Sequence, residues 1–257
     1  MKKLNLQYVI MFVVSLLLFV SCIGETPRKE VGNAFGVVRE KTFMQNVFDI
    51  SDGVTLYSSW FANMDPGTCL HIFYEIDYDL PANSPESVEA NGYYQVSVFN
   101  YQIIDDYPMS FFVTDTTEVW NEEVAHVKAV LDGGWYYVNG MFFICNVLNI
   151  PVDQEMYWNL SCDIENYVTE ENGKRYYDVF LRSAINESGA ASTVDVDIVN
   201  AFDMKYYLEK IAREEKQLGH ESFKLRFNYV SNIKDGQLTW SQQETNDIRV
   251  THIIPED

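Results

Sequence analysis

The stretch Cys69-Leu70-His71-Ile72-Phe73-Tyr74-Glu75-Ile76-Asp77-Tyr78 indicates the class of fold. Every second side chain along it is apolar and aliphatic or a tyrosine, and successive side chains of a β-strand point to opposite faces of the sheet. We therefore expect a strand whose inward face carries Leu70, Ile72, Tyr74 and Ile76. Its outward face is expected to carry His71, Phe73, Glu75 and Asp77.

Turn signals separate similar strands along the rest of the chain. Asp-Gly, Asn-Gly and Gly-Gly pairs favour positive φ and make tight hairpin turns. They occur at Asp52-Gly53, Asn91-Gly92, Asp132-Gly133-Gly134, Asn139-Gly140, Asn172-Gly173 and Asp235-Gly236. Together with little helical periodicity, they predict an all-β protein built from barrels or sandwiches.

A domain boundary is expected between Asp105 and Thr117, where the alternating pattern breaks. The strands expected before it lie around Phe35–Glu40, Val47–Ser59, Cys69–Tyr78 and Tyr93–Ile104. If one of them bends and is shared, they close a small five-stranded barrel. We assign the barrel to residues 34–108 and a second β domain to residues 109–257.

One helix is expected within the second domain, from Asp203 to Leu218. Asp203 can cap its start, and Gly219 follows where a left-handed residue would end it. Its apolar residues fall mostly on one face: Met204, Tyr207, Leu208, Ile211 and Leu218. Opposite charges four residues apart, such as Glu209 and Arg213, support its solvated side. We expect a crossover helix lying over one end of a sandwich.

The first 21 residues have the pattern of an export signal. Lys2 and Lys3 precede an apolar stretch from Tyr8 to Val20, which is too short to span a bilayer. The small Ser21 followed by Cys22 resembles the bacterial lipoprotein box, which implies that Cys22 carries the lipid. The alternatives are a plain secretory signal and an uncleaved anchor. Residues 22–33 are polar and suit a flexible tether.

The charge of the chain narrows the choice of partners. It has 18 basic and 38 acidic residues and a net charge of −20. Nucleic acid is therefore not expected as a partner, since binding it requires a cationic surface. An anionic membrane would also repel the body of the protein, so membrane attachment must come from the lipid anchor.

Three cysteines remain after Cys22, namely Cys69, Cys145 and Cys162. A disulfide between Cys145 and Cys162 is possible, because both lie in neighbouring strand-like segments. The alternative is three buried free thiols.

The sequence contains no motif for a metal, a cofactor or a catalytic residue. Its histidines are not at ligand spacing, it has no CxxC pair, and no serine lies in a GxSxG elbow. The alternating carboxylates Glu75, Asp77 and Asp79, and also Asp195 and Asp197, suit either a solvated face or a calcium site. We expect neither a cofactor nor a metal, and we do not expect an enzyme.

Aromatic residues on the outward face of the barrel suggest a ligand platform. Alternation places Phe73 outward on one strand, and Tyr93 and Tyr101 outward on another. With Trp60 they are our candidate ligand-binding residues for sugars or peptides. The alternative is that this face packs against the second domain.

The chain resembles the NigD-like lipoproteins of the Bacteroidetes. The resemblance rests on the lipobox, on Phe48–Leu56, on Pro66-Gly67 before the strand Leu70–Tyr78, and on Phe223–Tyr229. It implies an OB-fold domain followed by a β-sandwich domain, and it supplies no catalytic residues. The helix from Asp203 departs from the family pattern. So does the lack of an acidic run after Cys22, which leaves open the periplasmic face or the cell surface.

These observations predict an outer-membrane lipoprotein of the cell envelope that binds rather than catalyses. Its expected partner is a glycan, a peptide or an envelope protein. One alternative is an accessory or protective subunit that acts through protein contacts of the sandwich domain, and the last is a hydrolase.

Overall fold

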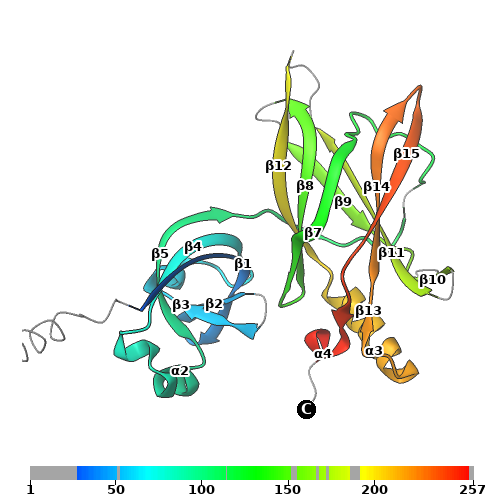
Figure 1. Ribbon diagram of the computed structural model, residues 1–257. Coiled ribbons are helices and arrows are strands. Elements are labelled where there is room, and N and C mark those ends of the chain that lie inside the picture. The colour runs from blue at the N-terminus through cyan, green and yellow to red at the C-terminus, as the bar shows by residue number, and fades with distance from the viewer. Residues whose placement is uncertain are drawn as a thin grey trace, which may run out of the picture.

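A computed structural model describes residues 28–50, 53–113, 115–151, 155–165, 168–171, 174–185 and 192–254. Two β domains lie side by side, the smaller formed by the N-terminal strands (Figure 1). The predicted signal peptide and Cys22 lie outside the described residues. Among the described helices, none has both the length and the apolar character to cross a bilayer.

The first domain is a closed barrel in the order β1-β2-β3-β5-β4, which confirms the predicted five-stranded barrel. Its strands are β1 (Lys29–Thr42), β2 (Gln45–Ile50), β3 (Thr55–Tyr57), β4 (Cys69–Asp77) and β5 (Tyr94–Ile103). Strand β1 is the shared one, since Gly36 lies opposite Ile50 of β2 and Leu70 of β4. A Cβ at Gly36 would lie 2.2 Å from the backbone oxygen of Asp49, so only glycine allows this close approach.

Strand β4 has the expected alternation, with Leu70, Ile72 and Ile76 buried and the intervening side chains partly exposed. One end of the barrel is filled by the 3₁₀ turn η2 (Ser59–Asn63). Its Phe61 is fully buried and stacks against Phe48, with ring centroids 5.3 Å apart. The barrel therefore has a continuous apolar core of its own.

The helix α2 (Pro85–Asn91), preceded by the turn η3 (Pro81–Asn83), links β4 to β5. Ser84 caps α2 by accepting a hydrogen bond from the Ser87 backbone nitrogen at 3.2 Å. Gly92, at φ 68°, ends it. The prediction of a hairpin turn at Asn91-Gly92 is therefore wrong, because the pair terminates a helix.

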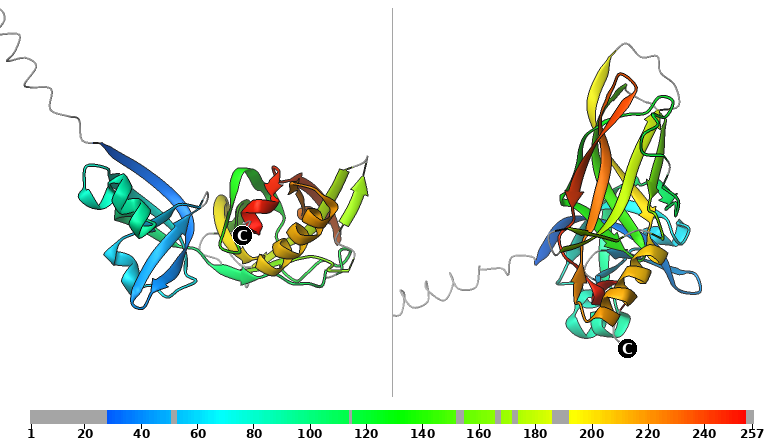
Figure 2. Two further views of the ribbon diagram at one scale, coloured as in Figure 1. Left: turned by 90° about the horizontal axis from the view of Figure 1, so that it is seen from below. Right: turned by 90° about the vertical axis from the view of Figure 1, so that its right-hand side faces the viewer.

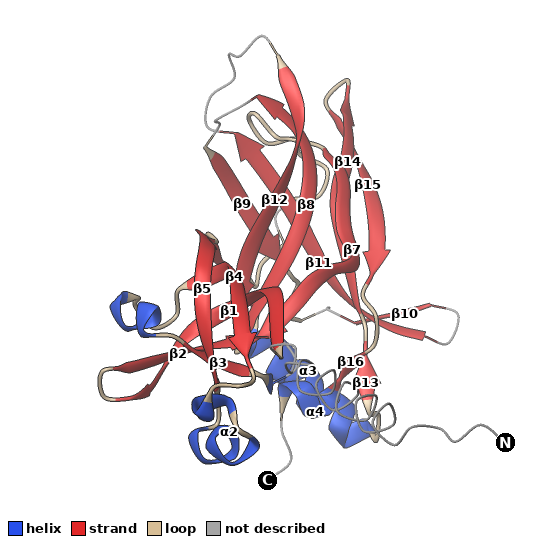
Figure 3. Ribbon diagram, turned by 60° about the vertical axis from the view of Figure 1, so that its left-hand side comes forward, coloured by secondary structure: helices blue, strands red, loops and turns tan. Residues whose placement is uncertain are grey.

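The second domain is a β-sandwich, as predicted (Figure 3). One sheet has the order β6-β12-β8-β7, and the other has the order β10-β11-β14-β15 with β9 also paired to β11. The first contains β6 (Asp106–Pro108), β7 (His126–Val138), β8 (Met141–Pro151) and β12 (Thr193–Asp203). The second contains β9 (Met156–Ser161), β10 (Val168–Glu171), β11 (Lys174–Ile185), β14 (Leu225–Lys234) and β15 (Gln237–Glu244).

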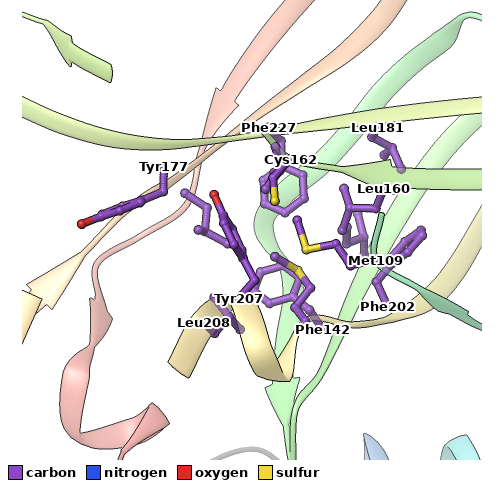
Figure 4. Packing of buried hydrophobic residues seen from close by; sticks show 14 of the residues in the cluster. Met109, Phe142, Leu160, Cys162, Tyr177, Leu181, Phe202, Tyr207, Leu208 and Phe227 are labelled. Carbon is purple, nitrogen blue, oxygen red and sulfur yellow. The ribbon is translucent and has the colours of Figure 1, made fainter. Parts of the chain in front are cut away.

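Side chains of both sheets and of one helix form the sandwich core (Figure 4). The helix α3 (Lys205–Leu218) follows β12 and crosses to the second sheet, which confirms the predicted crossover helix. Tyr207 and Leu208 of α3 are fully buried, Glu209 pairs with Arg213 at 2.8 Å, and Gly219 ends the helix at φ 82°. Together with α4 (Val250–Ile253), α3 lies over one end of the sandwich (Figure 2). The short pair β13 (Ser222–Phe223) and β16 (Ile248–Arg249) lies beside them.

The hairpin prediction succeeds at two other turns and fails at one. Asn139 and Asp235 have positive φ, each is followed by a glycine with positive φ, and each pair joins two antiparallel strands. The Asp132-Gly133-Gly134 run instead lies inside β7, where the register shifts between Val130 and Trp135. Its extra residues make a bulge rather than a turn. Asn172-Gly173 lies outside the described residues.

The structure shifts the expected bounds of tether and barrel. Strand β1 begins at Lys29, and its first residues pair with β4, so 29–33 form part of the barrel instead of a tether. Strand β6, expected in the barrel domain, pairs with β12 of the sandwich. The pattern of local alternation could not show either long-range pairing.

A third apolar cluster joins the two domains. It combines Val37 and Cys69 of the barrel with Val138, Phe143 and Ala201 of the sandwich. The backbone nitrogen of Ala201 also donates to the oxygen of Asp105, in the segment between the domains, at 2.9 Å. The domains therefore meet through a packed apolar contact, and the residues around this contact form the walls of an interdomain cleft.

Candidate functional site

The structure separates the four candidate ligand-binding residues into three places. Trp60 and Tyr101 lie together, with ring centroids 4.3 Å apart. Trp60 also contacts Phe61 edge-on and packs against the barrel core. Tyr101 remains 46% exposed, so this pair joins the barrel core to the barrel surface.

Tyr101 does not share the outward face of Phe73, and that part of the prediction is wrong. The pairing of β4 and β5 shifts at Phe99, which has no partner residue on β4. An extra residue in one strand reverses the faces of the residues that follow it. Tyr101 consequently lies opposite Ile72, a residue of the barrel core.

Phe73 belongs to a row of rings on the outer face of the barrel. Phe35 stacks on His71 at a centroid distance of 4.2 Å, His71 lies 4.7 Å from Phe73, and Phe73 lies 6.4 Å from Phe99. Phe35 also contacts Tyr136 of the sandwich at 5.2 Å. The row therefore begins in the domain contact and ends in solvent at Phe99, which is 61% exposed.

Tyr93 lies in the third place, next to the β1–β2 hairpin. The Lys41 ammonium lies 4.5 Å from its ring centroid, and the ring of Tyr57 lies 4.9 Å away. The Gln45 side chain donates to the Tyr93 hydroxyl at 3.3 Å. These contacts fix the Tyr93 ring on the barrel surface, away from the other three candidates.

The disulfide between Cys145 and Cys162 is not formed, and all three described cysteines are free thiols. Cys145 alternates along β8 with the core residue Ile144, so its side chain points to the opposite face of the sheet. Cys162 lies inside the sandwich core (Figure 4). Burial raises the pKa of the Cys162 thiol to about 12, so it stays protonated.

The alternating carboxylates of β4 share a cation of the chain itself. Lys29 Nζ lies 2.8 Å from Glu75 and 3.6 Å from Asp77. Asp195 accepts a hydrogen bond from the Asn149 side chain at 2.6 Å. No cluster of His, Cys, Asp or Glu within the described ranges could hold a metal ion.

The cleft between the domains has two lobes. The larger lobe has a volume of about 860 Å³ and lies between β2–β3 of the barrel, β7 of the sandwich and residues 247–253. The smaller lobe, of about 490 Å³, lies between β1, Pro66-Gly67, α3 and α4. Five residues line both lobes: Arg39, Tyr137, Asn139, His252 and Ile253.

A polar bridge crosses the domain boundary where the two lobes meet. Asp49 of β2 accepts hydrogen bonds from Arg39 Nε and Nη2, from the Thr55 hydroxyl at 2.7 Å and from Asn139 Nδ2 at 2.6 Å. Burial alone would raise the pKa of Asp49, but these hydrogen bonds outweigh it and hold the pKa below its ordinary value. Asp49 therefore remains ionised and fixes the Arg39 guanidinium at the edge of both lobes.

The β7–β8 turn places Asn139 in the cleft. Asn139 and Gly140 have φ values of 50° and 95°, which suit a tight hairpin turn. A Cβ at Gly140 would lie 2.7 Å from the Cβ of Lys205, so the turn packs directly on the start of α3. Helix α3 thus supports the turn that carries Asn139.

Sequence reasoning did not identify this cleft. Asp49 and Asn139 are 90 residues apart and lie in different domains, so no local pattern links them. In the sequence, both residues occur only as parts of turn-and-strand motifs. A polar Asn-Gly turn is an ordinary hairpin signal, and its position against the barrel depends on how the domains pack.

A serine and a histidine meet inside the sandwich. The Ser183 hydroxyl lies 3.2 Å from His126 Nε2, and burial lowers the pKa of His126 to about 4. Ser183 is 0% and His126 1% exposed. A substrate does not reach a pair this deeply buried, so we interpret it as a polar cluster that joins β7 to β11.

Comparison with known proteins agrees with the fold of both domains. Residues 28–102 match the family model of the lipoprotein OB domain. No curated protein matches the chain.

Solved structures match across both domains. A protein of uncharacterised function from Parabacteroides merdae is 18% identical, with a TM-score of 0.73 over 85% of this chain and 99% of that chain. A candidate lipoprotein from Bacteroides fragilis is 9% identical, with a TM-score of 0.57 over 86% of this chain and 99% of that one. A NigD-like immunity protein from Bacteroides caccae is 14% identical, with a TM-score of 0.49 over 85% of this chain and 94% of that one.

The first two structures show that the two-domain fold is shared by these proteins, and at these identities they show the fold alone. The expectation of a Bacteroidetes lipoprotein fold that begins with an OB domain is confirmed. The chain thus combines a barrel that matches the lipoprotein OB domain model over residues 28–102 with a β-sandwich that follows it.

Proposed function

We propose that the protein is a lipid-anchored binding protein of the cell envelope that holds an elongated ligand in its interdomain cleft. The observation that carries this proposal is the pair of lobes, of about 860 and 490 Å³, that meet at the Asp49–Asn139 bridge. Ligand sites commonly have volumes of about 300–1,000 Å³ and commonly lie between domains.

The anchor is Cys22, and the lipoprotein OB domain at residues 28–102 supports it. We propose that the lipid attaches the protein to the outer membrane, on its periplasmic face or on the cell surface. Lipid is needed because the net charge of −20 repels an anionic membrane surface. The same charge argues against nucleic acid as the ligand.

Two observations favour binding over hydrolysis. Ser183 and His126 are buried away from solvent. In the cleft, both oxygens of Asp49 already accept hydrogen bonds from two donors each, so this carboxylate is not free to act as a base or nucleophile.

A second candidate function is an accessory or protective subunit that acts through protein contacts. The tip of the β1–β2 hairpin supports it, because Phe43 and Met44 are 84% and 80% exposed there. Apolar side chains exposed together are typical of interaction sites. This surface lies on the barrel, whereas the sequence favoured the sandwich for such contacts.

The cleft proposal is tested by blocking the larger lobe with a bulky side chain. Thr251 lines this lobe and is exposed, so Thr251→Trp should fill it without disturbing a core. Thr239→Trp is the matched control, since Thr239 is an exposed threonine on β15 that lines neither lobe.

The full acylated protein in detergent micelles is applied to immobilised envelope polysaccharides, peptidoglycan fragments and peptides. We expect the wild type and Thr239→Trp to be retained equally and Thr251→Trp to be retained at least about ten-fold less. Equal retention of Thr251→Trp, or no retention of the wild type on any of these materials, would contradict the proposal.

A further inference from the structure

We infer that the ligand of the cleft is a neutral oligosaccharide chain, which crosses the Asp49–Asn139 bridge and accepts a hydrogen bond from Arg39 Nη1. This inference rests on the proposed function and adds the chemical class of the ligand. It also assigns Arg39 as the residue that recognises the ligand.

The hydrogen bonds to Asp49 use two of the three guanidinium nitrogens of Arg39 and leave Nη1 available for a ligand. Nε and Nη2 of Arg39 donate to the two oxygens of Asp49. Within the described part of the chain, Nη1 donates no hydrogen bond, and the Arg39 side chain is 47% exposed. Because Asp49 also accepts from Thr55 and Asn139, it cannot turn away, and the guanidinium is fixed before a ligand arrives. Nη1 is therefore a preorganised donor at the point where the lobes meet.

The charges around the cleft favour a neutral acceptor over an anion. Asp49 already compensates the charge of Arg39, so an anionic ligand would gain little from this pair. Lys205 also lines the smaller lobe, but Glu40 and Glu209 line it too, and Asp247 lines the larger lobe. The net charge of −20 adds long-range repulsion of anions. Hydroxyl and ring oxygens of a neutral sugar accept from Nη1 without this repulsion.

The shape and lining of the cleft favour a chain of sugars over a compact molecule. Arg39 and Asn139 line both lobes, so one ligand fills both only if it extends past these two residues. Tyr137 lines both lobes, and Tyr136 lines the larger one. Aromatic rings with nearby hydroxyl and amide groups suit sugars, which have an apolar ring face and polar edges. Thr55, Thr251 and His252 add neutral polar groups to the larger lobe.

The decisive variant is Arg39→Lys. Lysine keeps the positive charge beside Asp49 but has no planar guanidinium. It therefore cannot bind both oxygens of Asp49 and offer a further N–H donor to the ligand. Arg28→Lys is the control, because Arg28 lies in the barrel domain outside both lobes. Equal melting temperatures of the wild type and both variants establish that any loss of binding is not a loss of folding.

Titration calorimetry of the full acylated protein in micelles uses three classes of probe: neutral gluco- or manno-oligosaccharides, oligogalacturonides and lysine-containing peptides. Each class is tested as a series of increasing chain length. We expect neutral chains to bind more tightly as they lengthen across both lobes, and Arg39→Lys to weaken them about ten-fold or more. We expect oligogalacturonides of equal length to bind more weakly than neutral chains.

Stronger binding of oligogalacturonides or of peptides, or binding of neutral chains that Arg39→Lys leaves unchanged, would overturn the inference. If Thr251→Trp weakens the binding of the probe that binds most tightly, the cleft remains the binding site and only the ligand class is wrong. If Thr251→Trp weakens no probe, the proposed function itself fails.

Discussion

Asn139 of the sandwich donates its side-chain amide to Asp49 of the barrel across the domain boundary, at 2.6 Å. We predict that Asn139→Gly lowers the free energy of unfolding by about 1–2 kcal/mol, because the change keeps the positive φ of the turn and removes only the bond to a charged acceptor. Denaturant unfolding measures this loss. Asp235→Gly, at the matching position of another hairpin with φ 52°, should cost only a few tenths of a kcal/mol. Equal costs would show that the bridge contributes nothing.

A buried ion pair attaches the segment between β6 and β7 to strand β11 of the sandwich. Arg182 and Glu123 are 1% and 0% exposed in their side chains and make two hydrogen bonds, at 2.6 and 2.7 Å. We predict that Glu123→Gln costs about 3–5 kcal/mol, since it removes the carboxylate that compensates the buried Arg182 charge. The exposed Glu170, which pairs with Arg175, is the control, and Glu170→Gln should cost less than about 1 kcal/mol. If denaturant unfolding shows only a small loss of unfolding free energy for Glu123→Gln, this interpretation of the ion pair is wrong.

The stability of the sandwich should depend on pH through His126. Burial lowers the pKa of His126 to about 4, whereas an unfolded histidine titrates near 6.5. As the pH falls from 6.5 to 4, the unfolded chain therefore takes up a proton that the folded protein does not, and stability decreases by up to about 3 kcal/mol. Unfolding of His126→Gln should be less sensitive across this window, while His252→Gln, at an exposed site, should behave like the wild type. Identical pH profiles for all three proteins would contradict the assignment.

Membrane attachment should depend on Cys22. We predict that Cys22→Ala moves the protein from the membrane fraction to the soluble fraction, because acyl chains provide the anchor. Mass spectrometry of the wild type should find the amino terminus at Cys22 with added fatty-acyl mass. A wild-type Cys22 that is unmodified and still follows an uncut leader would refute lipidation.

Local patterns predicted the strands and the crossover helix well. The alternation in Cys69–Asp77 is set by burial on one face of a sheet, so the inward side chains could be read from the sequence. The same rule failed beyond Phe99, because a single unpaired residue reverses the faces and leaves no mark in the composition. At Asn91-Gly92, the signal that favoured a helix was present upstream, where Ser84 and Pro85 suit the N-cap and the first helical position.

The candidate site could not be predicted, for a different reason. Arg39 and Asp49 lie on neighbouring barrel strands, but Asn139 of the sandwich reaches them only when the two domains pack against each other. The sequence correctly located aromatic residues on the barrel, but the direction and the surroundings of each side chain depend on the bulge and on the domain contact. Phe35, for example, is drawn into that contact, while Phe99 remains in solvent.

Hydrogen–deuterium exchange of the full acylated protein, with and without the tightest-binding probe, tests the central claim most directly. We predict slower exchange on binding in residues 37–40, 136–140 and 247–253, which line the two lobes. Protection confined to the outer-face strands β4 and β5, with these three segments unchanged, would contradict the account.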